Sequence, residues 1–406
     1  MHILRSIPPT AGIPMFASDL ASLSKLGDQR DYLEDDFKQY LNLAYLRITC
    51  SGTVALYLIM ETIKELSSNR TIIIPSFICP LVPLAVHRAG FRIRVCDISH
   101  SDFNYDYAEL ESLCSTKNDT AGIIACHLAG IPVDMDALLS LSKRHRLFII
   151  EDCAQSLGAY YNNKKVGTFG DFSFFSLCRG KGITTYEGGA VATNNQEYGI
   201  ILDTKLKQLL TSNLLLESLR ILQLWGYWLF YRPQLFWFVF NLPQIFWNLQ
   251  GNVIKALAED FNLYFPIHGI SNIRKLLAHA AFCRLEEAIK KQRAKASYYI
   301  SQLSKKEGIR VIEEPAGAQA TYPYLTIVFD DRDKQKKALR NGQSAGLGIS
   351  QIYALPITDY YYLKDIISGG TCSTAQLMAQ RSITLSTSTF LQESDLHSVV
   401  NMMLNL

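Results

Sequence analysis

The sequence lacks the features that identify several large classes of protein. Its 406 residues carry a formal net charge of +3, without the charge excess typical of proteins that bind nucleic acids. The nine cysteines are scattered and form no CxxC pair, and the eight histidines show no metal-ligand spacing. We therefore expect no metal site, no disulfide framework and no nucleic-acid partner, and a reducing compartment, the cytosol, as the natural location.

Targeting and repeat signals are also missing from the sequence. The first residues, MHILRSIPPTAGIP, contain two adjacent prolines and no continuous apolar segment, so we expect no signal peptide. The chain contains no visible internal repeat or low-complexity linker. With 48% hydrophobic residues, it is long enough to form a sizeable core and two domains.

Short apolar runs in the first half of the chain have the length of β-strands. Early in the chain they alternate with helical patterns, which predicts a mostly parallel α/β sheet with crossover helices. The runs cover residues 71–74, 91–98, 121–127, 147–150, 172–177 and 189–193.

The last third of the chain predicts a smaller α+β domain. A helix near 275–305 precedes apolar segments at 321–329 and 383–390, and a helical pattern covers 393–404. We place a large domain at 1–260, and a connecting helix with a small C-terminal domain at 261–406.

The stretch 147–193 is the most informative, because it places an acid, an amide, a hydroxyl and a lysine between apolar runs. The run at 147–150 ends in Glu151 and Asp152, and ligands of open α/β sheets collect at the carboxyl ends of strands. Lys181 lies between two glycines, which allow the backbone to turn sharply and expose the amine.

These residue types match the needs of a pyridoxal-phosphate (PLP) site. Such a site requires an amine that attaches the cofactor and an acid that keeps its pyridine ring protonated as an electron sink. Lys181 and Asp152 would supply them, Gln155 would donate to the phenolic oxygen of the ring, and Ser173 would donate to the phosphate. Singly, each has an ordinary explanation as a solvated lysine or a strand-end cap. Together, in this order, they favour the cofactor.

The segments EDCAQSLGA, VGTFGDFSFFS and RGKGITTYEGGAVAT resemble the signature of the PLP-dependent sugar aminotransferases of the DegT/StrS group. Residues 49–60, 72–98, 125–138 and 269–288 also fit, so the resemblance covers most of the chain except one internal block and the extreme termini. It implies a type I aminotransferase fold, with a mostly parallel central sheet, helices on both faces and a smaller α+β C-terminal domain. It also implies transfer of an amino group, from glutamate, to a nucleotide-linked keto-sugar.

The resemblance assigns the same roles to the central residues. Lys181 holds pyridoxal 5′-phosphate, Asp152 pairs with the ring nitrogen and Gln155 contacts the phenolic oxygen. The lysine also argues against the relatives that carry histidine at this position and eliminate water instead. Two other functions remain open: amination of a cyclitol or lipid-linked ketone, and a catalytically silent PLP-binding regulator, which this intact set of three residues disfavours.

Gly52, Thr53 and Ser173 would hold the phosphate by the same resemblance. The residues agree for Gly52 and Thr53, because a small-residue turn that opens a helix directs N–H groups and a positive dipole end toward an anion. An ordinary Ser/Thr helix cap is the alternative. The family often places an aromatic ring over the cofactor, whereas Cys79 occupies that position here, with Phe77 two residues earlier. Either a thiol packs on the ring or the register is shifted.

Asn272 resembles the residue that family members extend across a dimer interface into the partner's site. This resemblance implies a homodimer. Arg274 either joins Asn272 there or is an ordinary solvated arginine of a helix.

One block, 203–262, departs from the family pattern and contains all four tryptophans, Trp225, Trp228, Trp237 and Trp247. Arg232, Pro233, Gln234 and Pro243 cut its apolar runs well short of the roughly 20 residues of a membrane span. Three interpretations remain open: a hairpin at 221–248 that dips into the inner face of a membrane, a subunit interface, and a lid packed on the domain's own core. In the first interpretation, Arg220 and Arg232 meet lipid phosphates.

Overall fold

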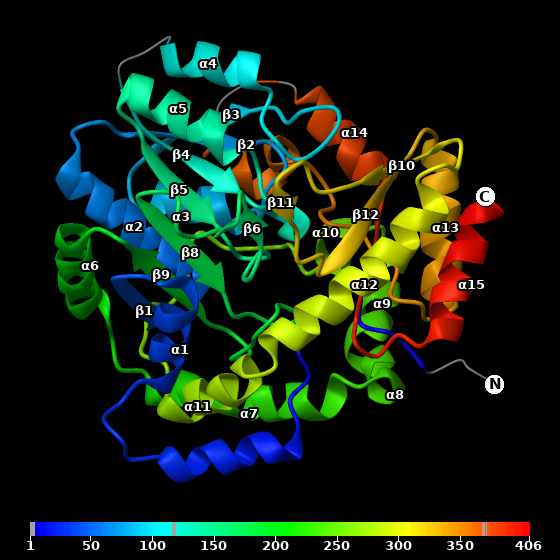
Figure 1. The fold of residues 1–406 in the computed structure, drawn as a ribbon, viewed down its shortest axis with the longest axis horizontal. Helices are drawn as coiled ribbons and strands as arrows, with labels where there is room; N and C mark the ends of the chain where they lie inside the picture. Colours follow the sequence, from blue (N-terminus) through cyan, green and yellow to red (C-terminus); the bar gives the residue numbers. More distant parts are fainter. Residues whose placement is uncertain (1–4, 116–118, 368–369, 371) are drawn as a thin grey trace.

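The computed structural model describes residues 5–115, 119–367, 370 and 372–406 (Figure 1). A seven-stranded sheet in the order β1-β9-β8-β5-β4-β2-β3 forms its centre. The strands are β1 Tyr45–Thr49, β2 Thr71–Pro75, β3 Arg92–Cys96, β4 Thr120–Cys126, β5 Phe148–Asp152, β8 Phe172–Ser176 and β9 Gly189–Thr193. The five strands from β8 to β3 are parallel, and β9 pairs antiparallel with β8 and β1. The prediction of a mostly parallel α/β sheet is confirmed.

Helices cover both faces of this sheet because the side chains of a strand alternate between the faces. In β2, Ile72 and Ile74 pack in the core of one face with helices α2 (Gly52–Leu66) and α3 (Leu81–Arg88). Ile73 packs in the core of the other face. That second face is covered by helices α1 (Tyr32–Leu41), α4 (Tyr107–Ser115) and α5 (Met135–His145). Both faces of the sheet are therefore shielded from water, and central strands such as β2 and β4 are almost continuous apolar runs.

Strand β1 is absent from the expectations drawn from the sequence. Arg47 interrupts its apolar pattern, and its guanidinium pairs with Asp203 at 3.0 Å. The backbone N–H of Ile48 donates to Glu34 at 2.9 Å. Side chains distant in the sequence thus complete this edge strand, and no local pattern reveals them.

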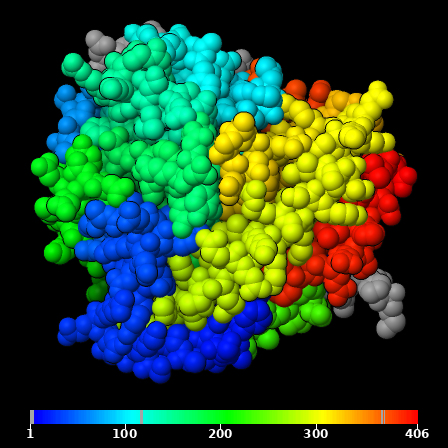
Figure 2. All heavy atoms as spheres, viewed as in Figure 1, coloured from blue at the N-terminus to red at the C-terminus, as the bar shows by residue number. Residues whose placement is uncertain are grey.

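The C-terminal part contains a three-stranded antiparallel sheet, β10-β12-β13, with bounds Ile309–Ile312, Tyr324–Phe329 and Ser382–Ser386. Helices α12 Leu285–Leu303, α13 Arg332–Ser344, α14 Ser373–Arg381 and α15 Glu393–Leu404 accompany it. A second small sheet, β11-β6-β7, pairs Ala318–Gln319 with Tyr160–Tyr161, and that strand with Lys164–Lys165. Figure 2 shows the C-terminal residues, yellow to red, gathered on one side of the molecule. The predicted α+β character is confirmed, including the last helix.

The predicted continuous helix near 275–305 is two helices. The first, α11, spans Asn272–Phe282, and α12 begins at Leu285. At the break, Arg284 turns its guanidinium onto Asp19, at 2.6 and 2.9 Å. Asp19 lies in a 3-10 helix, Ala17–Lys25, of the N-terminal segment. The ion pair therefore ties this segment to the junction between α11 and α12.

Residues 209–268, which contain all of the aromatic block except 203–208, fold as a chain of helices that we call the insert. After α6 (Gln196–Leu209), it contains α7 Leu214–Phe230, α8 Pro233–Phe236, a π-helical turn Trp237–Asn241, α9 Leu242–Leu249 and α10 Val253–Ala256. Figure 1 shows α7 beside α11. Leu224, Tyr231 and Phe236 are buried, so part of the insert packs on the body of the protein. Within the described residues, no helix is long and apolar enough to cross a membrane.

Candidate active site

A cavity of about 560 Å³ opens where β4, β5 and β8 end and α2 begins. Six of the residues predicted from the sequence line it: Gly52, Thr53, Cys79, Asp152, Gln155 and Lys181. They come from separate segments between residues 52 and 181, and the parallel sheet brings them together because its strands end at one edge. His127, Ser176, Tyr324 and Tyr353 line the same cavity and were not among the predicted site residues.

Asp152, the last residue of β5, is a buried acid with uncharged hydrogen-bond partners. One carboxylate oxygen accepts from the Ala154 N–H at 3.0 Å, and the other lies 3.8 Å from the Cys126 thiol. Burial raises the pKa of Asp152 above its ordinary value, and the ammonium of Lys181 acts in the opposite direction. A cationic group beside this carboxylate would therefore be strongly favoured.

Its neighbour Glu151 is buried just as deeply but is fully compensated by the chain. Its oxygens accept from the N–H groups of Gly167, Phe169 and Gly170 at 2.6 to 2.7 Å. The His127 ring lies 3.2 Å away and accepts from the Val133 N–H through Nδ1, so Nε2 carries the proton toward Glu151. The oxygens of Glu151 and both nitrogens of His127 already have partners. Glu151 and His127 therefore form a structural network, although one ligand atom each of His127, Glu151 and Cys153 lie within 4.8 Å of one another, close enough to hold a metal ion.

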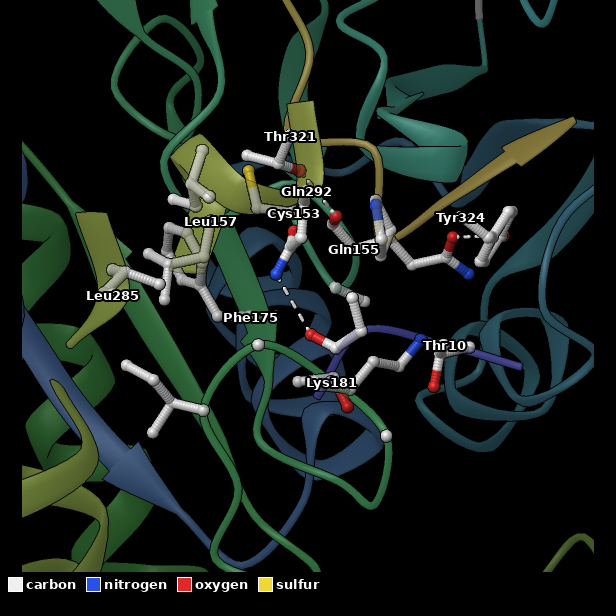
Figure 3. A pocket seen from close by; sticks show the side chains of 18 of the residues that line it. Thr10, Cys153, Gln155, Leu157, Phe175, Lys181, Leu285, Gln292, Thr321 and Tyr324 are labelled. Carbon is white, nitrogen blue, oxygen red and sulfur yellow. Dashed lines mark hydrogen bonds between the residues drawn. The ribbon is translucent and has the colours of Figure 1, made fainter. Parts of the chain in front are cut away.

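Lys181 lies in a tight loop that follows β8. The backbone of Gly180 has a φ of +71°, a conformation that favours glycine. The loop is held from outside by the N-terminal segment, since the Ile13 N–H donates to the Gly182 carbonyl at 2.9 Å. Figure 3 shows the lysine side chain extending toward Thr10 and Gln155.

Gln155 is oriented by two hydrogen bonds to its side-chain oxygen. The Ala129 N–H donates to it at 3.0 Å, and the Tyr324 hydroxyl at 2.5 Å (Figure 3). With the oxygen engaged, the amide N–H groups of Gln155 are left to donate toward the cavity. Tyr324 belongs to β12 of the C-terminal sheet, so both parts of the chain build this contact. The sequence pattern alone identifies Tyr324 only as part of an apolar strand.

The start of α2 forms an anion cradle. The Ser51 hydroxyl accepts from the Val54 N–H at 3.1 Å, and the N–H groups of Gly52 and Thr53 precede the first intrahelical bond. Gly189 of β9 packs against this turn so closely that a Cβ atom there would lie 2.4 Å from the Gly52 nitrogen. The glycine therefore allows the helix start to approach the strand ends.

Three predicted residues lie elsewhere. Ser173 is buried and donates to the Gly167 carbonyl at 2.8 Å, and Ser176, at the end of the same strand, lines the cavity instead. Phe77 packs edge-on against Tyr353, with ring centroids 5.3 Å apart, and does not line the cavity. Asn272 is exposed at the start of α11, outside the cavity of its own chain.

Both expectations for Arg274 are wrong, because its side chain is fully buried within the chain. It binds Glu217 of the insert at 2.7 and 2.5 Å. It also donates to the carbonyls of Thr185, at 3.1 Å, and Glu187, at 2.5 Å, on the loop that follows Lys181. The partner carboxylate is 57 residues away, so no local pattern indicates this pairing.

The end of the insert forms one wall of the cavity. Residues 260–262 and 264–266 line it, and Glu259 anchors them to the C-terminal part. One oxygen of Glu259 accepts from the Tyr360 hydroxyl at 2.6 Å and from the Ala354 N–H at 3.0 Å. Burial raises the pKa of Glu259 to about 7.

Known proteins resemble this chain in sequence and in structure. A sequence model of the DegT/DnrJ/EryC1/StrS aminotransferase family matches residues 17–208 and 269–404. GDP-perosamine synthase of Escherichia coli O157:H7 is 33% identical over 178 residues, which is 44% of this chain and 48% of that protein. UDP-4-amino-4,6-dideoxy-N-acetyl-beta-L-altrosamine transaminase of Campylobacter jejuni is 31% identical over 191 residues, which is 44% of this chain and 50% of that protein. The chain thus spans about half the length of the curated relatives that it matches.

Solved structures match over nearly the whole chain. Spr1654 from Streptococcus pneumoniae in its PLP form superimposes with a TM-score of 0.77, 17% identity and 98% coverage of both chains. Helicobacter pylori PseC, an aminotransferase of pseudoaminic acid biosynthesis, gives a TM-score of 0.75, 18% identity and 99% coverage of both chains. At these identities the likeness establishes the fold, which is the α/β architecture with a mostly parallel central sheet expected from the sequence.

The Glu259 anchor makes stability depend on pH. A carboxyl whose folded pKa is raised stabilises the fold fully below its ordinary pKa, about 4.5, and that contribution is lost as the pH rises through about 7. Glu259→Gln keeps the oxygen acceptor but removes the charge. At pH 8 we expect it to be roughly 1–3 kcal/mol more stable than the wild type, with little difference at pH 5. Urea unfolding at both pH values, with the exposed Asp333→Asn as control, measures this. A difference in the free energy of unfolding between wild type and Glu259→Gln that is the same at pH 5 and pH 8 would contradict it.

Proposed function

The chain belongs to the DegT/DnrJ/EryC1/StrS aminotransferase family, and we propose that it transfers an amino group from glutamate to the ketone of a nucleotide-linked sugar, with pyridoxal 5′-phosphate as cofactor. The observation that carries this proposal is the convergence of Asp152, Gln155, Lys181 and the start of α2 on one cavity. The names of the relatives support the substrate class, since those in Escherichia coli and Campylobacter jejuni are enzymes of GDP- and UDP-linked amino sugars.

The residues of the cavity fit the cofactor. Asp152 is a buried acid whose hydrogen-bond partners are uncharged, and a protonated pyridine nitrogen would stabilise its charged form directly. The start of α2 offers backbone N–H groups to a phosphate, and Ser176 lines the cavity. The volume of about 560 Å³ lies in the range of small-molecule sites.

Each residue has one task in the proposed reaction. When bound, pyridoxal 5′-phosphate supplies an electron sink for the bond that breaks at the α-carbon of the amino donor. Asp152 would hold the proton on the ring nitrogen, and Gln155 would donate to the phenolic oxygen. Once the donor has bound, the Nζ atom of Lys181 would take the proton from the α-carbon of the donor and return it to the cofactor carbon to which the nitrogen is transferred. The second half of the reaction runs these steps in reverse on the sugar ketone.

The first prediction concerns Lys181. The purified protein should show a visible absorption band that sodium borohydride removes, with the reduced cofactor attached to Lys181 in peptide maps. Lys181→Ala should abolish turnover and still bind the cofactor, because the phosphate and ring contacts remain. Lys165→Ala, on a half-buried lysine outside the cavity, is the matched control. Attachment to another lysine would contradict the assignment.

Product analysis separates the other candidate functions. A panel of nucleotide-linked keto-sugars, cyclitol ketones and lipid-linked keto-sugars, each supplied with glutamate, identifies the acceptor by the mass of the aminated product. Amination of the cyclitol or lipid-linked members alone would replace the nucleotide-linked substrate in the proposal. No product from any member, despite bound cofactor, would favour a silent regulator.

We also propose that the active unit is a homodimer in which Asn272 extends into the site of the partner subunit. Its exposed position at the start of α11, away from its own cavity, is compatible with such a contact. Sedimentation velocity tests this proposal, and a fully active monomer would contradict it.

A second proposed property is peripheral attachment to the inner face of a membrane through residues 221–248 and the adjoining helix ends. The outer side of the insert exposes large apolar side chains: Leu214, Leu215, Leu219, Leu222, Leu229, Phe238, Val239, Leu242, Ile245, Phe246 and Leu249. The charged side chains between them turn inward. Arg220 pairs with Glu187, and Arg232 donates to the Met15 carbonyl, so neither is free to meet lipid phosphates as the sequence suggested. The large exposed side chains of this segment are thus apolar and its arginines are engaged within the chain, which supports contact with a lipid interface.

This attachment predicts binding to vesicles. Burying a few of these side chains would contribute several kcal/mol, at roughly 25 cal/mol per Å² of apolar surface. We expect the wild type to co-sediment with phosphatidylcholine and phosphatidylglycerol vesicles alike, and Ile245→Ser/Phe246→Ser/Leu249→Ser to remain in the supernatant. Ile200→Ser, an exposed apolar side chain on α6, is the matched control and should bind as the wild type does. A wild type that stays in the supernatant would contradict the proposal.

A further inference from the structure

The insert reaches the loop that carries Lys181 through two tyrosines at the end of α7. Tyr227 and Tyr231 are one helical turn apart, and their rings stack with centroids 4.5 Å apart at an interplanar angle of 22°. Tyr231 is 4% exposed, so its hydroxyl must find partners inside the protein.

The Tyr231 hydroxyl finds them on the N-terminal segment. It accepts from the Gly12 N–H at 3.2 Å and donates to the Thr10 carbonyl at 2.9 Å. Burial raises the pKa of Tyr231 to about 12, so the hydroxyl keeps the proton that it donates at neutral pH. Thr10 lines the cavity beside Lys181. Three residues later, the Ile13 N–H donates to the Gly182 carbonyl at 2.9 Å. The segment is thus clamped between the insert and the lysine loop.

The insert, the N-terminal segment and the lysine loop are in close contact around Gly12. A Cβ atom at Gly12 would lie 2.9 Å from the Tyr231 hydroxyl oxygen, 3.1 Å from the Lys181 carbonyl oxygen and 3.2 Å from the Tyr227 hydroxyl oxygen. A displacement of Tyr231 is therefore transmitted to the backbone of Lys181 through a single glycine, because close-packed interiors transmit strain.

Helix α7 also holds the other arm of the same loop. Arg220 forms an ion pair with Glu187, and Glu217 binds Arg274, which in turn donates to the carbonyls of Thr185 and Glu187. The lysine loop is thus attached to α7 on both of its sides. These attachments come from a segment outside the two blocks that match the family, 17–208 and 269–404.

We propose that Tyr231 is a positioning residue for Lys181: its hydroxyl fixes the segment from Thr10 to Ile13 and thereby the place of the lysine amine in the cavity. The proposal rests on the proposed function, in which Lys181 attaches the cofactor. It gives the insert a role in the site of this chain that the family pattern does not contain.

The test separates cofactor binding from covalent attachment. Tyr231→Phe removes the hydroxyl and keeps the ring. We expect the affinity for pyridoxal 5′-phosphate, measured by equilibrium dialysis, to change little, because the phosphate cradle and Asp152 are untouched. The rate at which the visible band forms after mixing, with borohydride trapping at Lys181, should fall on the order of tenfold, the factor that loss of one buried hydrogen bond corresponds to. In turnover, kcat should fall more than KM rises.

Two further variants keep the test decisive. Tyr298→Phe, on α12 and stacked on His397, is the matched control and should attach the cofactor at the wild-type rate. If Tyr231→Phe fails to fold, Gly12→Ala replaces it, since its methyl group presses on the Tyr231 hydroxyl and the Lys181 carbonyl and should slow attachment in the same way.

The outcomes distinguish a failure of the proposed function from a failure of the positioning role of Tyr231. A wild type that never attaches the cofactor to Lys181 overturns the proposed function, and the inference with it. The inference alone is overturned if the wild type attaches the cofactor to Lys181 and the folded Tyr231→Phe variant attaches it at the same rate. The same holds for Gly12→Ala where it replaces Tyr231→Phe.

Discussion

The burial of two adjacent carboxylates at the end of β5 is the constraint on which the rest of the site depends. Removing a carboxylate from water is costly unless hydrogen bonds or a cation compensate it. Glu151 receives three backbone N–H groups and the His127 ring, so its burial fixes the turn at 167–170 against the sheet. Asp152 receives one N–H and lies near a thiol, and its pKa is raised. One carboxylate is therefore structural, and the other keeps a raised pKa although Lys181 lowers it, so a further cation would stabilise its charged form.

The other parts of the site surround the Asp152 carboxylate. The parallel order of the strands brings Asp152, the start of α2 and the lysine loop to one edge of the sheet. The C-terminal sheet contributes Tyr324, which orients Gln155, and the end of the insert closes one wall through Glu259. The insert also constrains the lysine loop, through the N-terminal segment that Tyr231 binds and through Glu217, which pairs with Arg274 of α11. Segments far apart in the sequence thus constrain a single lysine.

Much of this could be predicted because it depends on local pattern. Strands buried on both faces appear as unbroken apolar runs, and Lys181 between glycines marks a loop. What could not be predicted depends on partners distant in the sequence. Arg274 is buried because Glu217 of the insert meets it, and Tyr324 matters because it crosses to Gln155. Ser173 has the residue type of a phosphate donor, yet its side chain is committed to the Gly167 carbonyl.

The central claim is that the carboxylate of Asp152 pairs with the protonated ring nitrogen of the cofactor. The half-reaction of Asp152→Asn with glutamate tests this claim most directly. The amide keeps the hydrogen-bonding shape of the site but cannot hold the ring proton. Stopped-flow absorbance should show that the variant retains bound pyridoxal 5′-phosphate while its reaction with glutamate slows by about two orders of magnitude or more. A half-reaction at close to the wild-type rate would contradict the account.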